Sequence, residues 1–156
     1  MMANRGEFDG EMLRASVIEK EAPNLIRIPT VLATVRFHVF SIKNKSYTGI
    51  DMLGETTGIL RGIKIIEEML KNKNPFVGNT PRSLFGMLLA GRLENVLLPT
   101  IAGEGAIKKL GAGWSKVKKL APPAKILNVY TYLHKKNKDL VSIVNKSIAK
   151  FPPLKL

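Results

Sequence analysis

Residues 30–42 read TVLATVRFHVFSI and carry the clearest strand signal in this chain of 156 residues. The segment is rich in β-branched and aromatic residues, which suit a pleated, half-buried surface. Five of its apolar side chains alternate onto one face: Val31, Ala33, Val35, Phe37 and Val39. Residues 43–46 can turn the chain and residues 47–53 can return it as a second strand. The sequence therefore predicts an N-terminal β-hairpin.

Outside this hairpin, apolar residues recur at the spacing that is typical of helices. Thr80-Pro81 is a strong helix start, because it offers a capping hydroxyl and then a proline at the first helical position. The segment that follows, Leu84–Leu97, has the broadest apolar stripe and is predicted to form the core. The other candidate helices are residues 11–21, 57–70, 124–136 and 139–151. The predicted fold class is α+β and mainly α-helical, with an N-terminal β-hairpin followed by four or five amphipathic helices.

The predicted domain organisation is one small domain over residues 11–151, with an irregular arm at 1–10 and a tail at 152–156. A hydrophobic content of 45% suffices for a packed core. No stretch without a charge or a proline is longer than 83–91, which is far shorter than the roughly 20 residues that span a membrane. The N-terminus lacks the apolar segment of a secretory signal. We therefore expect no transmembrane span and no secretion.

The formal net charge of +13 is concentrated in the second half of the chain. Residues 1–80 contain 11 Lys and Arg against 9 Asp and Glu, whereas residues 81–156 contain 14 against 3. An asymmetry of this kind indicates an anionic partner. The expected partners are acidic subunits of a large assembly, nucleic-acid phosphates or an anionic membrane surface, and no small-molecule substrate is predicted.

The basic residues cluster in 103–123, GEGAIKKLGAGWSKVKKLAPP, and again in 135–138. On a helical wheel, the apolar residues between Ile107 and Ala121 share one face and most lysines take the other. Gly111 and Gly113 each cost about 1 kcal/mol relative to alanine in a helix, which favours a docked helix or a bent two-piece segment. The candidate partner-binding or anion-binding residues are Lys108, Lys109, Trp114, Lys116, Lys118, Lys119, Lys135, Lys136 and Lys138.

No pattern of residues predicts catalysis, a cofactor or a metal ion. The chain contains no cysteine and two histidines, His38 and His134, too few for a conventional zinc site. Ser-x-x-Lys occurs at Ser115–Lys118 and Ser147–Lys150, but the partner motifs that would give it a catalytic meaning are missing. We therefore expect a protein that is not an enzyme.

The functional hypothesis is a structural subunit of a large macromolecular assembly. Polar, proline-containing chain ends fray unless neighbouring subunits hold them. Together with the basic second half, this favours a virus or phage particle, with the protein as a capsid or tail component, over a ribosome-like or organellar complex. One alternative is a non-specific nucleic-acid-binding protein that contacts phosphates without reading bases. A second alternative is a peripheral membrane protein that uses the Trp114 face.

Overall fold

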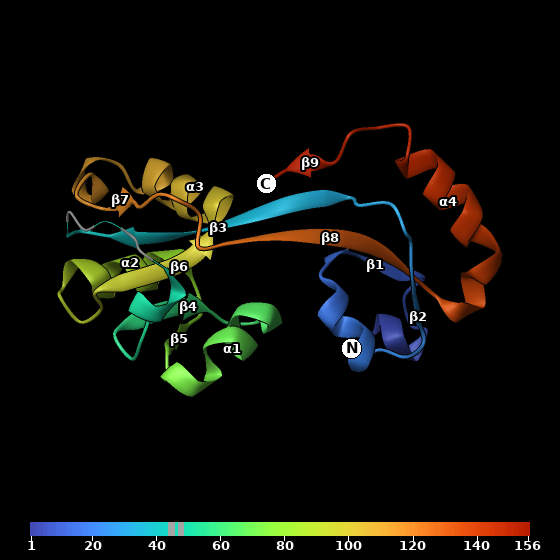
Figure 1. The fold of residues 1–156 in the computed structure, drawn as a ribbon, viewed down its shortest axis with the longest axis horizontal. Coiled ribbons are helices and arrows are strands. Elements are labelled where there is room, and N and C mark those ends of the chain that lie inside the picture. Colours follow the sequence, from blue (N-terminus) through green and yellow to red (C-terminus); the bar gives the residue numbers. More distant parts are fainter. Residues whose placement is uncertain (44–45, 47–48) are drawn as a thin grey trace. The chain divides into compact units, whose positions relative to one another are not determined.

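The computed structural model describes residues 1–43, 46 and 49–156, and its chain divides into two units (Figure 1). Unit 1 comprises residues 1–35 and 127–156, and unit 2 comprises residues 36–126. The chain passes between the units inside two strands, β3 (Ala33–Ser41) and β8 (Lys125–His134). The sequence alone had suggested one domain over 11–151, and the two units are described separately below.

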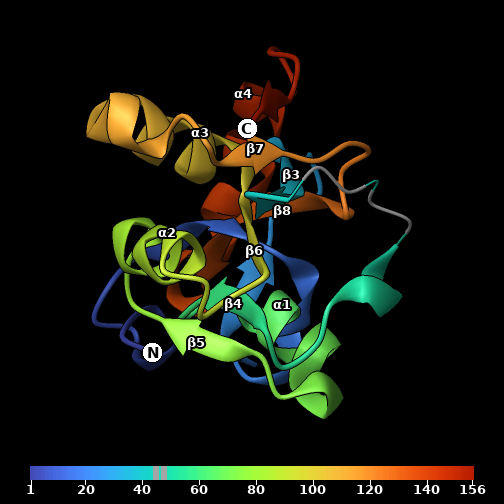
Figure 2. The same ribbon diagram turned by 90° about the vertical axis from the view of Figure 1, so that its left-hand side faces the viewer.

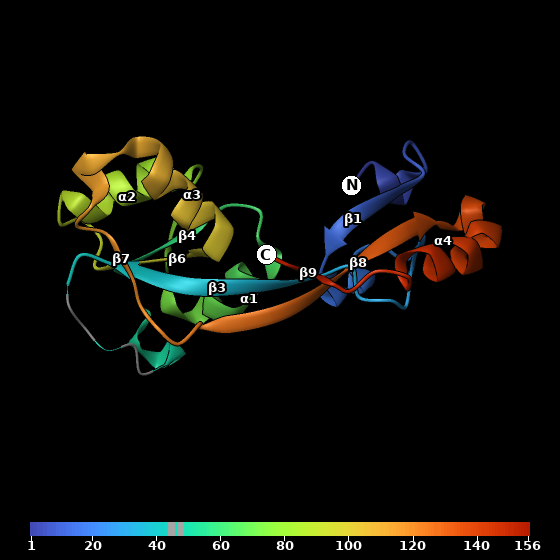
Figure 3. The same ribbon diagram turned by 90° about the horizontal axis from the view of Figure 1, so that it is seen from above.

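Unit 1 is built around the part of β8 that follows residue 126 (Figure 3). β8 pairs antiparallel with β1 (Gly10–Arg14) and with β2 (Leu25–Arg27), so that Glu11 and Arg27 lie opposite Tyr132 from its two sides. The first residues of β3 pair with β9 (Leu154–Lys155). Three 3-10 helices and one α-helix complete the unit: Ala3–Arg5, Ser16–Lys20, Lys135–Leu140 and α4 (Val141–Ile148). A small core gathers Ala3, Ala22, Leu25 and Tyr132.

Unit 2 is an α/β body whose sheet has the order β7-β3-β6-β4-β5. The strands β4, β5 and β6 run parallel, and β3 is antiparallel to β6 and β7. Three α-helices alternate with these strands (Figure 2). The elements are β4 (Thr57–Leu60), α1 (Lys64–Leu70), β5 (Phe76–Gly78), α2 (Pro81–Leu89), β6 (Asn95–Pro99), α3 (Thr100–Leu110) and β7 (Lys118–Lys119). Single turns of 3-10 helix lie at Ile50–Met52, Lys71–Lys73 and Ala112–Trp114.

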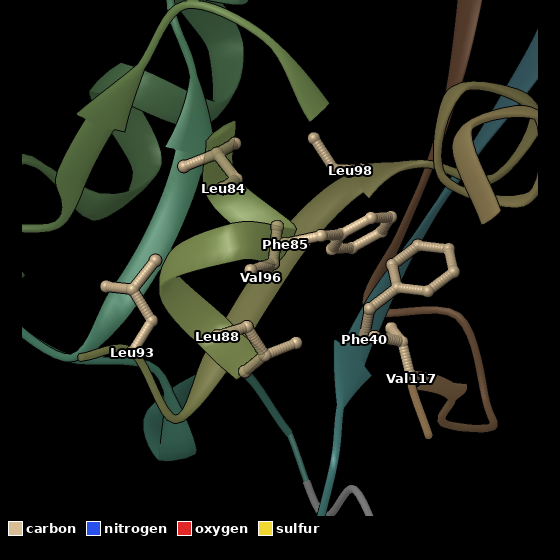
Figure 4. Close-up of a cluster of buried hydrophobic side chains, with 8 residues drawn as sticks. All are labelled: Phe40, Leu84, Phe85, Leu88, Leu93, Val96, Leu98 and Val117. Carbon is tan, nitrogen blue, oxygen red and sulfur yellow. The ribbon is translucent and has the colours of Figure 1, made fainter. Parts of the chain in front are cut away.

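The main core of unit 2 lies between α2 and the strands β3 and β6 (Figure 4). The rings of Phe40 and Phe85 meet edge to face, with their centroids 5.4 Å apart. Helix α3 approaches β3 closely at Gly103, where a Cβ atom would lie 2.2 Å from Cζ of Phe40. The buried cluster consists of Phe40, Leu84, Phe85, Leu88, Leu93, Val96, Leu98 and Val117. The prediction that residues from Leu84 onward form the core is confirmed.

The predicted mainly helical fold is wrong. Strands replace helices at 57–60, 95–99 and 125–134, and four α-helices occur in the described part of the chain. Residues Asn95–Leu98 are all buried because β6 lies inside the sheet, between β3 and β4. A strand that is covered on both faces reads as a continuous apolar run and loses the alternation that identifies a strand. For this reason the apolar residues of β6 were predicted as a continuation of the helix that precedes them.

The predicted N-terminal hairpin is also wrong, although its first strand exists as β3. Of the proposed return strand 47–53, Tyr47 and Thr48 lie outside the described residues, and Ile50–Met52 form a turn of 3-10 helix. The partners of β3 are instead the distant strands β6, β7, β8 and β9. Residues 11–21, predicted as a helix, contain the end of β1 and a 3-10 helix.

Within the described residues, no helix is both long and apolar enough to cross a membrane.

Candidate functional site

The sheet of unit 2 has a point at which its connections change direction. From β4 the chain passes through α1 to β5 on one side, and from β6 it passes through α3 to β7 on the other. Ile59 lies opposite Leu97, so β4 and β6 end side by side. In open α/β sheets, ligands bind outside the carboxyl ends of the strands at such a point. We call this place, residues 60–62 together with 99–103, the carboxyl edge.

Arg61 and Gly62 follow β4 and form the first half of the carboxyl edge. The backbone N–H of Arg61 donates to the carbonyl oxygen of Gly78 over 2.9 Å, and its Nε donates to Oδ1 of Asn79 over 2.8 Å. Gly62 takes a φ of +86°, and its N–H donates to Oε1 of Glu67 over 2.7 Å. These bonds orient the exposed Arg61 side chain. Its two terminal nitrogen atoms have no hydrogen-bond partner among the described residues.

The N-terminus of α3 forms the second half. Pro99 occupies the position before the helix, where a polar side chain usually accepts from the first turn, and it offers no acceptor. The first N–H groups of any α-helix lack partners inside the helix, and the helix dipole adds partial positive charge there. An uncapped helix start of this kind is suited to an anionic group.

Thr100 connects this helix start to β3. Its hydroxyl donates to the carbonyl oxygen of Arg36 over 2.9 Å, and its Oγ1 lies 2.6 Å from Nδ1 of His38. A hydroxyl has one proton and a carbonyl oxygen can only accept. His38 therefore donates from Nδ1, and its Nε2 carries the lone pair when the ring is neutral.

The pKa of His38 is lowered, first by burial and then by the positive charge of Lys119, while Glu104 opposes the shift and Arg36 adds to it. The lowered pKa favours the neutral imidazole. Glu67 accepts from Gly62 and pairs with Lys64 over 3.7 Å, and Glu104 forms an ion pair with Lys119. With Arg36, Arg61 and the helix start, the surroundings of the carboxyl edge are positive. This arrangement can bind a carboxylate.

The basic residues predicted from the sequence divide between the two units. In unit 2, Lys108 and Lys109 lie exposed in the last turn of α3, which ends at Gly111 with a φ of +73°. The predicted bent segment is thus a helix, a 3-10 turn and the strand β7. Trp114 is half-buried against Phe85, with ring centroids 5.8 Å apart. Lys116, Lys118 and Lys119 are exposed.

The remaining predicted residues, Lys135, Lys136 and Lys138, lie in unit 1, on the 3-10 helix Lys135–Leu140. Lys136 forms an ion pair with Asp9 over 3.1 Å and donates to the carbonyl oxygen of Gly6 over 2.8 Å. This lysine therefore has a structural partner inside its own unit.

Sequence reasoning did not identify the carboxyl edge. The sequence pattern predicts one helix over residues 57–70, whereas the chain forms a strand that ends at Leu60. The dipeptide Arg61-Gly62 could have indicated this, because a glycine after a short apolar segment favours a turn. Nothing local identified Thr100, whose partner His38 is 62 residues away. Among the described residues, no group of three or more His, Asp or Glu side chains is placed to hold a metal ion.

Comparisons with known proteins found similarity at the level of structure. No family model and no curated protein matches the sequence. A histidine kinase sensor domain with similarity to periplasmic binding proteins matches 96% of this chain and 66% of its own, with a TM-score of 0.72 and 16% identity. An ancestral arginine-binding protein bound to glutamine matches 96% and 67%, with a TM-score of 0.70 and 15% identity.

The GluR0 ligand-binding core in complex with L-glutamate matches 96% of this chain and 68% of its own, with a TM-score of 0.76 and 9% identity. The chain thus spans about two thirds of the length of these structures and shares their fold. The hypothesis of a virus or phage subunit is wrong, as are its nucleic-acid and membrane alternatives, because this is a fold of ligand-binding domains. The expectation of no small-molecule partner is corrected on the same ground.

Proposed function

We propose that this chain is a ligand-binding protein that binds a small molecule of the amino-acid class, and that unit 2 contacts the ligand's carboxylate at the carboxyl edge. The observation that carries the proposal is the uncapped start of α3 beside Arg61, where two adjacent parallel strands end. Two of the structures that share the fold are complexes with glutamine and L-glutamate.

The chemistry of the carboxyl edge supports a carboxylate in preference to a cation. Arg61 has terminal N–H groups free to form a pair of parallel hydrogen bonds with the two oxygen atoms of a carboxylate. The first-turn N–H groups of α3 supply further donors in fixed positions. Because Asn79 and the backbone already orient Arg61, its ordering adds little entropy loss on binding.

Isothermal titration calorimetry of the full chain with L-arginine, L-glutamine and L-glutamate tests the proposal. At least one of them is expected to bind at the carboxyl edge, with one ligand molecule at that site. Arg61→Gln removes a hydrogen-bonded charge and should weaken that binding roughly tenfold or more. Arg92→Gln is the matched control, since this exposed arginine precedes the amino end of β6 and should leave the affinity unchanged.

A second variant tests the contribution of the start of α3 to binding independently of Arg61. Pro99→Asp places a carboxylate at the capping position, where it accepts from the first turn of α3 and competes with the ligand. Binding should weaken while thermal stability is kept or rises. If none of the three amino acids binds, or if both variants bind like the wild type, the proposal is wrong.

The absence of catalysis belongs to the same proposal. A ligand-binding protein returns its ligand unchanged, so mass spectrometry of the ligand after prolonged incubation should recover it intact. A product that forms with the wild type and not with Arg61→Gln would show that the chain is an enzyme.

A further inference from the structure

Unit 1 contains a cavity of about 420 Å³ whose lining combines two opposite charges with an aromatic ring and small apolar side chains. The charges are Glu19 and Arg27, and the ring is that of Tyr130. The size lies within the range of about 300–1,000 Å³ that is usual for small-ligand sites. None of the lining residues belongs to unit 2, so this cavity is separate from the carboxyl edge.

The sheet register positions Arg27 over the cavity. Arg27 lies opposite Tyr132, and Tyr130 lies two residues away on the same face of β8. The guanidinium carbon of Arg27 is 5.0 Å from the centroid of the Tyr130 ring, which is the geometry of a cation–π contact. Its Nη1 is also 3.2 Å from Oε1 of Glu19. The guanidinium is therefore fixed by a ring and a carboxylate at once.

Glu19 is fixed just as firmly, through one of its two oxygen atoms. Oε1 accepts from the hydroxyl of the fully buried Tyr132 over 2.9 Å and also faces Arg27. Burial, and then the bond to Glu19, raise the pKa of Tyr132, so its phenol remains a donor. Oε2 of Glu19 and both Nε and Nη2 of Arg27 have no hydrogen-bond partner within the described residues. A donor and an acceptor of opposite charge thus remain available side by side.

We propose that this cavity binds a small zwitterion, with its ammonium group on Glu19, its carboxylate on Arg27 and its aliphatic part against Ala22, Leu25 and Pro29. A ligand with a single charge would face a like charge from one member of the pair, at a distance where repulsion is strong. A zwitterion with its charges a few atoms apart satisfies both members.

This inference is independent of the proposed function. The carboxyl edge requires only a carboxylate, whereas the unit 1 cavity requires both charges. The two sites share no residue, and variants of one leave the other intact.

Three compounds with the same branched aliphatic end test the contribution of each ligand charge to binding. L-Valine carries both charges, isobutylamine lacks the carboxylate, and isovalerate lacks the ammonium group. Each is titrated into the full, isotope-labelled chain and followed through the backbone amide signals of Glu19, Arg27 and Tyr130. Valine should shift these signals to saturation, with an affinity at least about tenfold higher than that of either analogue. Equal affinities for valine and isovalerate would overturn the proposal.

Two variants that each remove one protein charge test which side chain binds which charge of the ligand. Glu19→Gln keeps an oxygen that accepts from Tyr132 but removes the negative charge, so valine should bind about tenfold more weakly and isovalerate more tightly than to the wild type. Arg27→Gln should weaken valine and strengthen isobutylamine in the same way. Lys20→Gln, next to Glu19 but outside the cavity lining, is the control and should change neither affinity. A well-dispersed amide spectrum establishes that each variant is folded. Unchanged valine binding by Glu19→Gln would refute the assignment.

Discussion

The Nδ1 atom of His38 lies 2.6 Å from the Oγ1 atom of Thr100, and the same hydroxyl donates to the carbonyl oxygen of Arg36 over 2.9 Å. This chain of two hydrogen bonds ties the first residue of α3 to β3, the strand against which that helix packs. His38 is 7% exposed, and its lowered pKa favours the neutral imidazole next to the helix start that we propose as a carboxylate site.

The stability of the protein should fall as the pH drops below about 6.5, in part because of His38. Its folded-state pKa is below the ordinary value of 6.5, so the native state binds fewer protons than the unfolded chain in this range. The contribution is fully present above pH 6.5 and is lost as the pH falls through the folded-state pKa. Urea unfolding at pH 7.5 and 5.5 should show a smaller loss in His38→Asn, whose amide can still donate to Thr100. An equal loss in both proteins would contradict this prediction.

Gly103→Ala should destabilise unit 2 by about 1–3 kcal/mol, because the new Cβ would meet the ring of Phe40 at 2.2 Å and force β3 and α3 apart. Gly105→Ala in the same helix is the matched control, since nothing lies within 4 Å of its Cβ position. The control should gain up to about 1 kcal/mol from helix propensity. Chemical unfolding of both variants measures the two effects, and the same sign for both would refute the close approach.

Phe85→Ala should cost about 3–5 kcal/mol of unfolding free energy, because its fully buried ring contacts both Phe40 and Trp114. Phe151→Ala, at a residue that is 72% exposed, should change the stability by less than about 0.5 kcal/mol. The only tryptophan, Trp114, reports the change directly. Its emission should shift to longer wavelength in the folded Phe85 variant, and an unchanged spectrum would speak against the packing of these two rings.

Thr80→Ala should cost about 0.5–2 kcal/mol, because the Thr80 hydroxyl caps α2 by accepting from the N–H of Ser83 over 3.1 Å. Thr80→Ser keeps the oxygen and should retain most of the stability. Thermal unfolding of the two variants measures the difference. Equal melting temperatures would show that the cap contributes nothing.

Helix α2 could be predicted from the sequence because its signals are local. Thr80 and Pro81 mark its start, and Leu84, Phe85 and Leu88 share one face only in a helix. Its end was also marked, by Gly91 with a φ of +72°, a sign that the predicted helix through Leu97 passed over.

Strand β8 was predicted as a helix for a different reason. Residues 125–134 contain β-branched and aromatic side chains, among them Val129, Tyr130 and Tyr132, which suit a strand. The apolar positions also matched a helical spacing, and the hydrogen bonds that β8 makes to β1 and β2 decided between the two. Both β1 and β2 end more than 90 residues before β8 begins, and its third neighbour, β3, is also distant in the sequence.

The sequence by itself determined that residues from Leu84 onward enter the core, where α2 starts and that positive charge is in excess in the second half. Burial preference, capping and charge are properties of single residues and close neighbours. Only the tertiary structure decided that β6 and β8 are strands, that Thr100 meets His38 and that Glu19 meets Arg27 and Tyr132. The reason is physical: a strand satisfies its backbone hydrogen bonds with distant segments, and a binding site collects side chains that those pairings bring together.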